Sequence, residues 1–164
     1  MNQPLTPPAV QPAFSVCVYC GSKPGNKPEF SQIAVQVGTW IGAHGGQLVY
    51  GGGRNGLMGL VAEATMAAGG TVVGIIPTAL VEKEWAHHGC TELHVVDTMH
   101  ERKRLMADKA DAFLALPGGI GTFEELFEVW CGVSKGTLVP APPKYPHHEE
   151  ARWNVGWNFF ATRT

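Results

Sequence analysis

The sequence of 164 residues contains no apolar run that reaches the roughly 18 residues needed to span a bilayer. Its first stretch, MNQPLTPPAVQPAF, has no basic region followed by an apolar core, so it does not resemble a secretory signal. Charged side chains are scarce, and 12 basic against 14 acidic residues leave a formal net charge of −2. We therefore expect no membrane partner, no nucleic-acid partner and a cytoplasmic location.

Motifs for metal and redox chemistry are absent or incomplete. Cys17 and Cys20 form a CxxC pair, but no second pair completes a zinc site, and the apolar run FSVCVYC around Cys17 favours a buried thiol. His87 and His88 lie in the segment EWAHHG without a third ligand at metal spacing, which favours a surface location. No HExxH motif or Ser–His–Asp order appears. We expect neither a metal ion nor a cofactor.

Hydrophobic residues and glycine are abundant, with 45% hydrophobic residues and 21 glycines. Five apolar runs of strand length alternate with stretches of helical period. The runs are continuous, which is typical of strands buried on both faces of a parallel sheet. The sequence therefore predicts one α/β domain, an open parallel sheet with helices on both faces. The predicted strands cover 14–20, 47–50, 71–76, 93–96 and 112–116, and the predicted helices cover 28–43, 57–68, 100–109 and 122–130.

The two ends of the chain differ from this pattern. Residues 1–13 are rich in proline and predict a disordered tail. After Trp130 no regular period is clear, since Gly132 favours an early end of the last helix and PAPPKYP disfavours regular structure. We therefore predict a folded domain over 14–130 and an atypical, mostly irregular segment over 131–164.

Ligands of such sheets bind outside the carboxyl ends of the strands, which directs attention to the loops there. The motif YGGGRNGLMG contains a GxGxxG match, but no acidic residue follows at the distance that a nicotinamide dinucleotide site requires. Two interpretations stay open: contact with a phosphate through Gly52 and Gly53, or a tight turn packed on the sheet. Ser22, in the first loop, is suited either to bonding a phosphate or to a local turn.

The motif PGGIGTFEE follows a predicted strand and begins a predicted helix. Gly118, Gly119 and Gly121 allow the backbone to approach a ligand closely. Thr122 is suited to capping the helix, and Glu125, three residues later, fits a capping box. Glu125 therefore has both a structural and a functional interpretation.

The motif MHERK places two cations, Arg102 and Lys103, at the start of another predicted helix. A cation there opposes the helix dipole, so it indicates either a bound anion or a solvated basic face. In the helix after PGGIGT, Glu124 and Glu128 share one face, whereas Glu125 lies on another.

These motifs resemble the signature of the LONELY GUY (LOG) family, whose members are often labelled lysine decarboxylase-like. The resemblance rests on MHERK and PGGIGTFEE, with support from GS, YGGGRNGLMG, IIP and KE, and it covers residues 14–130. It implies a Rossmann-like fold and a dimer with its sites near the subunit interface. The implied activity is hydrolysis of cytokinin riboside 5'-monophosphate, and in several relatives of AMP, to a free base and ribose 5-phosphate. No lysine lies in a recognisable pyridoxal phosphate setting, so we reject decarboxylation.

The resemblance also implies roles for individual residues. Arg102 and Glu125 match the catalytic pair. Glu125 would stabilise an oxocarbenium-like sugar or orient water, while Arg102 would stabilise the departing purine or hold the phosphate end. The predicted substrate-binding residues are Ser22, Gly52, Gly53, Glu84, Lys103, Gly118, Gly119, Gly121, Thr122 and Glu124.

The chain departs from the family pattern after Trp130. The family continues with a helix containing TWAQLG and with a further strand and helices, whereas this chain reads CGVSKGTLVPAPPKYP, with Cys131 in place of a threonine. We therefore expect the last strand and helices of the family to be missing. The alternative function is a nucleotide-binding module without catalysis, or an inactive truncated relative.

Overall fold

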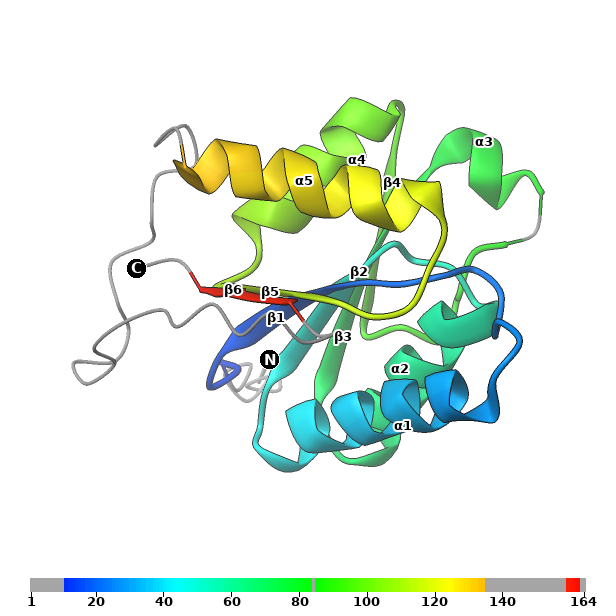
Figure 1. The fold of residues 1–164 in the computed structure, drawn as a ribbon, viewed down its shortest axis with the longest axis vertical. Helices are drawn as coiled ribbons and strands as arrows, with labels where there is room; N and C mark the ends of the chain where they lie inside the picture. Colours follow the sequence, from blue (N-terminus) through cyan, green and yellow to red (C-terminus); the bar gives the residue numbers. More distant parts are fainter. Residues whose placement is uncertain (1–10, 84, 135–158, 163–164) are drawn as a thin grey trace, which may run out of the picture.

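The computed structural model describes residues 11–83, 85–134 and 159–162, which form a single sheet with helices on both of its faces (Figure 1). The strand order is β4-β3-β2-β1-β5-β6. The α/β Rossmann-like fold is thereby confirmed, with one short helix, α3, that the sequence pattern does not predict. In chain order the elements are β1 (Ser15–Tyr19), α1 (Pro28–Ala43), β2 (Gln47–Tyr50), α2 (Gly56–Ala67), β3 (Thr71–Pro77), α3 (Thr78–Val81), β4 (Glu92–Val96), α4 (Met99–Asp108), β5 (Ala112–Ala115), α5 (Ile120–Ser134) and β6 (Phe159–Thr162).

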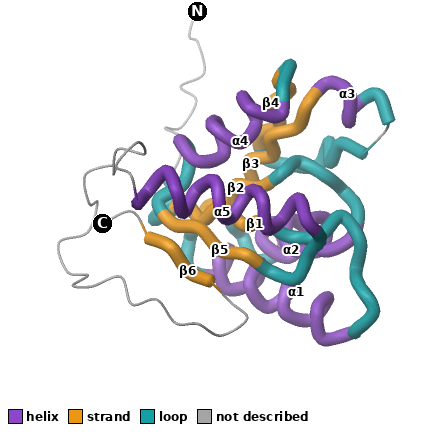
Figure 2. Tube along the Cα trace, turned by 45° about the horizontal axis from the view of Figure 1, so that its top comes forward, coloured by secondary structure: helices purple, strands orange, loops and turns teal. Residues whose placement is uncertain are grey.

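The parallel strands β1, β2, β3 and β5 are largely buried between two layers of helices, whereas β4, at the edge of the sheet, has only exposed and half-buried residues (Figures 1 and 2). Helices α1 and α2 cover one face, while α4 and α5 cover the other. Alternate residues of each strand enter opposite cores: Val18 packs in one, and Cys17 and Tyr19 pack in the other. This arrangement explains why the strands have continuous apolar sequences. Cys17 and Cys20 are both buried free thiols, which confirms the interpretation of the CxxC pair.

The start of α4 is fixed by local sequence. Thr98 is the N-cap: its hydroxyl accepts a hydrogen bond from the Glu101 backbone at 3.1 Å, and Glu101 Oε2 accepts one from the Thr98 backbone at 3.1 Å. This reciprocal capping box places Arg102 in the first turn of α4, directly beside the carboxyl edge of the sheet.

The C-terminal part differs from the prediction in two respects. Helix α5 does not end at Gly132 but continues to Ser134, because a glycine near a helix end costs only about 1 kcal/mol. The segment expected to be mostly irregular includes β6, which pairs antiparallel with β5 along the edge that would otherwise be open. Residues 1–10, 84, 135–158 and 163–164 lie outside the described residues, so the disordered tail and the domain boundaries remain predictions. In the described part of the chain, no helix has the length and apolarity needed to cross a membrane.

Candidate active site

Two loops meet where the strand order reverses beside β1. Gly21, after β1, donates its backbone N–H to the Pro117 carbonyl, after β5, at 3.1 Å. The Leu116 N–H similarly bonds the Tyr19 carbonyl at 2.9 Å. The loop with Ser22 and the loop PGGIG therefore lie side by side at the topological switch point, the usual ligand position of an open α/β sheet.

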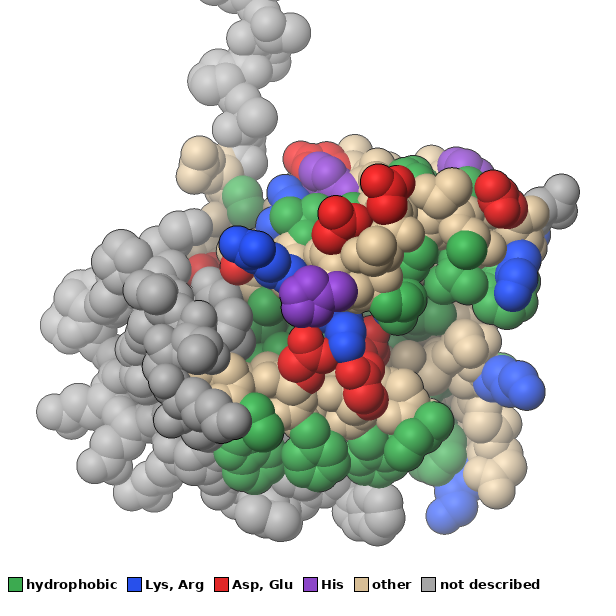
Figure 3. All heavy atoms as spheres, turned by 90° about the horizontal axis from the view of Figure 1, so that it is seen from above, with side chains coloured by type: hydrophobic (Ala, Val, Ile, Leu, Met, Phe, Trp, Pro, Cys, Tyr) green, Lys and Arg blue, Asp and Glu red, His purple; other side chains and the backbone are tan. Residues whose placement is uncertain are grey.

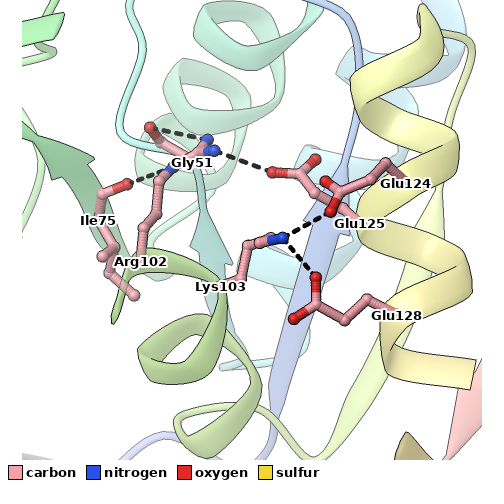
Figure 4. A network of polar contacts seen from close by, with 7 residues as sticks. All are labelled: Gly51, Ile75, Arg102, Lys103, Glu124, Glu125 and Glu128. Carbon is pink, nitrogen blue, oxygen red and sulfur yellow. Dashed lines mark hydrogen bonds and ion pairs between the residues drawn. The ribbon is translucent and has the colours of Figure 1, made fainter. Parts of the chain in front are cut away.

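Arg102 lies beside this position and is buried, with 7% of its surface exposed. Its guanidinium is held by groups from three other elements or loops (Figure 4). Nε donates to the Ile75 carbonyl at 3.0 Å, Nη2 to the Gly51 carbonyl at 3.4 Å, and Nη1 to Glu125 Oε1 at 2.9 Å. The solvated-face interpretation is therefore wrong for Arg102, because its planar donors are engaged in the protein interior.

Glu125 reaches Arg102 from α5, and the two catalytic candidates thus lie together. The Glu125 side chain is 11% exposed. Burial raises the pKa of the Glu125 carboxyl, while the positive charge of Arg102 opposes that rise. Within the described residues, the second carboxylate oxygen, Oε2, has no protein hydrogen-bond donor. It is therefore the oxygen suited to a substrate or a water molecule.

The glycine-rich segment after β2 makes space for the arginine. A Cβ on Gly51 would overlap Arg102 Nη2, so a larger residue there would displace the guanidinium. Gly53 forms an isolated antiparallel bridge with Ala86, which ties this segment to the loop before β4. Close packing against Arg102 thus accounts for part of the GGG sequence, and the roles of Gly52 and Gly53 remain predictions.

Lys103 forms a second, more exposed ion-pair cluster on the same face. Its ammonium group contacts the carboxylates of Glu124 and Glu128, as Figure 4 shows, and these contacts raise the pKa of Lys103. The expected shared face of Glu124 and Glu128 is confirmed, since both bind one partner. In Figure 3, side chains of both charges lie at the centre of this face, beside a row of hydrophobic side chains.

The loop after β5 borders a cavity of about 950 Å³ that is mostly apolar. Ser22, Gly118, Gly119 and Thr122 line one part of it. Phe30, Ile33, Leu57, Leu116, Phe123 and Leu126 line the apolar part. The cavity lining does not include Arg102 or Glu125, so the predicted residues divide into a cavity group and an ion-pair group.

Three details of the predicted site need correction. Thr122 does not cap α5, because the helix begins two residues earlier, at Ile120, and Thr122 lies inside its first turn. Glu125 therefore forms no capping box and bonds Arg102 instead. His87 is less exposed than expected: its side chain is 13% exposed and contacts Cys90, whereas His88 is exposed as expected. Glu84 lies outside the described residues.

Sequence patterns missed the carbonyl groups that hold Arg102. The backbone oxygens of Gly51 and Ile75 leave no trace in residue types, because any residue carries a carbonyl. The third partner, Glu125, was accessible to sequence reasoning, since its motif follows a strand at the same sheet edge.

Comparison with known proteins identifies the family. A family model described as "Possible lysine decarboxylase" matches residues 58–144, more than half of the chain. The chain belongs to the LONELY GUY (LOG) family. A LOG relative from Rhodococcoides fascians, named cytokinin riboside 5'-monophosphate phosphoribohydrolase, is 55% identical over 70% of this chain and 59% of its own length. Relatives with the same activity in their names, from Mycobacterium tuberculosis and Arabidopsis thaliana, are 48% and 46% identical, over 76% and 70% of this chain and 66% and 54% of their own lengths.

Solved structures agree with LOG membership at the level of the fold. A crystal structure titled TM1055, a structural genomics target, matches with a TM-score of 0.63 and 28% identity, over 73% of this chain and 70% of that chain. The molybdenum cofactor carrier protein of Chlamydomonas reinhardtii matches with a TM-score of 0.63 and 22% identity, over 72% of this chain and 71% of that chain. The chain spans 54% to 66% of the lengths of the three phosphoribohydrolases above.

Proposed function

We propose that this chain hydrolyses the N-glycosidic bond of cytokinin riboside 5'-monophosphate, and also of AMP, to a free base and ribose 5-phosphate. The observation that carries the proposal is the buried pair of Arg102 and Glu125, joined at 2.9 Å beside the glycine loop. The names of the relatives support the substrate class.

The chemistry fits a single buried carboxylate. Water adds its oxygen to the anomeric carbon, the bond to the purine nitrogen breaks, and the bonding electrons leave with the base, which takes up a proton. The sugar carries positive charge in the transition state. A carboxylate at this position stabilises that charge and accepts the proton of the attacking water, and Oε2 of Glu125 is the oxygen for both tasks.

Arg102 acts in this proposal as a positioning residue. Its Nε, Nη1 and Nη2 atoms each already donate a hydrogen bond within the protein, to Ile75, Glu125 and Gly51. The sequence indicates two alternative roles for Arg102, stabilising the purine or holding the phosphate. Neither role uses these three hydrogen bonds. We assign Arg102 the role of holding the Glu125 carboxylate in place and of supplying positive charge beside it.

The phosphate is assigned to the glycine loop at the start of α5. The loop leads into the N-terminus of a helix whose bounds are Ile120–Ser134, where free backbone N–H groups favour an anion. An added Cβ on Gly119 or Gly121 would meet no described atom within 4 Å, so space for a ligand is open beside both. Ser22 lies across the same cavity.

A pair of alanine substitutions tests the phosphate position. Gly119→Ala should raise KM for AMP by about tenfold or more, because the methyl group enters the phosphate space, and should leave the unfolding midpoint unchanged. Gly118→Ala should instead lower the unfolding midpoint, because its Cβ would overlap the Thr122 side chain. Steady-state kinetics and thermal melts separate the two effects. An unchanged KM for Gly119→Ala would place the phosphate elsewhere.

The pH dependence of activity should report the ionisation of Glu125. Because burial raises its pKa, kcat/KM should fall as pH is lowered, with an apparent pKa above about 4.3, the ordinary glutamate value. The AMP phosphate also titrates, near pH 6. The negative charge of Glu124 also raises the pKa of Glu125, so Glu124→Gln should shift the fall in kcat/KM to lower pH. A fall caused by titration of the AMP phosphate would not shift in this variant. If Glu124→Gln leaves the pH of this fall unchanged, Glu125 is not the group that titrates.

A second candidate is nucleotide binding without turnover. The feature that favours it is the sequence after Trp130, where CGVSKGTLVPAPPKYP departs from the family pattern. Incubation with AMP and with isopentenyladenosine monophosphate, followed by chromatography of the free base, separates the candidates. Binding of AMP without release of base from either substrate would support the second.

We also propose a cytoplasmic homodimer. Four hydrophobic side chains of α5, at positions 120, 123, 127 and 130, follow helical spacing and are 85%, 50%, 56% and 36% exposed, which supports contact with a second copy. The free thiols Cys17, Cys20, Cys90 and Cys131 support a reducing compartment.

A further inference from the structure

A cluster of reactive side chains lies outside the proposed site, on the side of the sheet that faces α2. Cys90 Sγ lies 3.2 Å from His87 Nδ1 and 3.2 Å from the Tyr50 hydroxyl. His87 Nε2 lies 3.9 Å from Glu63 Oε1. The four side chains come from the end of β2, from α2 and from the loop before β4, so the fold and not a local motif brings them together.

The order of these groups suits activation of a thiol. A nucleophile, a base and a carboxylate that orients the base are the parts of a general nucleophilic site. When Nδ1 accepts the thiol proton, Nε2 carries the other hydrogen and faces the Glu63 carboxylate. Burial raises the pKa of Cys90, and the hydrogen bond from Tyr50 opposes this rise. The thiol is thus protonated at rest and depends on His87 for deprotonation.

Cys90 is also packed against the backbone that holds Arg102. Arg102 donates hydrogen bonds to the carbonyls of Gly51 and Ile75. The residues that lie beside Cys90 directly precede these two in the sequence: Tyr50 precedes Gly51, and Gly74 precedes Ile75. A Cβ on Gly74 would lie 3.3 Å from Cys90 Sγ, which shows how closely the sulfur approaches β3.

The loop that carries Cys90 is joined directly to the glycine segment after β2. The His87 N–H donates to the Gly52 carbonyl at 2.9 Å, and the Arg54 N–H donates to the Trp85 carbonyl at 2.9 Å. Cys90 is only partly buried, and an oxygen atom added on the side of the sulfur that faces β3 would crowd this backbone and displace the loop or the strand. Either displacement moves a carbonyl partner of Arg102.

We propose that Cys90 is a peroxide-sensitive modification site, at which oxidation of the thiol to a sulfenic acid loosens the backbone around Arg102 and lowers turnover at Glu125. His87 takes the thiol proton, and the thiolate attacks one oxygen of hydrogen peroxide. The O–O bond breaks as the S–O bond forms, and the leaving hydroxide takes the proton from His87 and departs as water. Sulfur is oxidised by two electrons and the peroxide is reduced. The effect on turnover rests on the proposed function, whereas the oxidation itself does not.

The oxidation is tested on the full chain with Cys131→Ser, which removes an exposed thiol. Brief treatment with hydrogen peroxide in the presence of dimedone, followed by peptide mass spectrometry, should label Cys90 and leave the buried Cys17 and Cys20 unlabelled. His87→Gln and Glu63→Gln should each slow labelling of Cys90, the first by about tenfold or more. Absence of label at Cys90, or an unchanged rate in His87→Gln, would overturn the proposal.

The coupling to Arg102 is tested by hydrogen exchange and by base release on parallel samples treated with hydrogen peroxide without dimedone, because dithiothreitol reduces a free sulfenic acid but not its dimedone adduct. Oxidation should increase exchange in residues 50–54 and 99–105 and lower AMP hydrolysis in proportion to the label, and dithiothreitol should reverse both changes. Cys90→Ala and Cys90→Ser should keep activity under peroxide. Labelling without a change in exchange would overturn the coupling. If untreated protein releases no base, the proposed function fails, and labelling and exchange still decide the present proposal.

Discussion

Glu125→Gln should reduce the release of adenine from AMP by about 10²–10⁴-fold, the range expected for loss of a carboxylate that acts on the reacting atoms. Glutamine keeps the size of the side chain and an oxygen that can accept from Arg102 Nη1, but it carries no charge for the sugar cation and no basic oxygen for water. Because the phosphate is assigned to the glycine loop, the affinity for AMP should change by no more than a few-fold. Chromatography of the free base and calorimetry of AMP binding measure the two quantities.

Glu128→Gln is the matched control for this substitution. Glu128 lies one helical turn away on α5, its side chain is 43% exposed, and it shares Lys103 with Glu124. The control variant should keep most of the wild-type rate, since Glu124 still neutralises Lys103. Equal losses in the two variants would indicate a general effect of charge on α5 and would remove Glu125 from the mechanism.

Sequence patterns predicted the elements well because burial on both faces leaves a clear mark. Strands β1, β3 and β5 are mostly apolar and buried, and the predicted bounds 28–43 coincide with helix α1, Pro28–Ala43. The patterns failed at α3, which has only four residues and is too short to show a period. They also failed at β6, because a strand that pairs with a sheet edge through its backbone does not require an alternating pattern.

In the candidate site, too, some features were predictable from residue types and others were not. The resemblance to the LOG family implied that Arg102 and Glu125 act as a pair, and the structure joins them at 2.9 Å. Of the two interpretations left open for Glu125, the capping box is wrong, whereas Glu101, which no sequence pattern singled out, forms the capping box of its helix. Both glutamates follow a threonine by three residues, so spacing could not distinguish them, and only the position of the helix start does.

Arg102→Met should lower the free energy of unfolding by about 3–5 kcal/mol at pH 7, a large part of the total stability of a domain. Removal of the guanidinium leaves Glu125 buried without its partner and leaves the carbonyls of Gly51 and Ile75 without their donor. Urea denaturation followed by circular dichroism measures the loss. The Arg102→Met variant should also be inactive, because Glu125 is no longer held.

The pH dependence of this loss identifies its cause. Without Arg102, burial and the charge of Glu124 still raise the pKa of Glu125, and only Lys103 still lowers it, so its pKa in the folded state lies further above its value in the unfolded chain. A raised carboxyl pKa in the folded state means that stability is highest below about pH 4.3 and declines as pH rises toward the folded-state value. The difference between wild type and Arg102→Met should therefore grow from pH 4 to pH 7. The double variant Arg102→Met/Glu125→Leu removes the unpaired charge, so it should be more stable at pH 7 than Arg102→Met alone while remaining inactive. A loss that is independent of pH, with no recovery in the double variant, would mean that the packing of the arginine stem, and not the buried charge pair, connects α4 to α5.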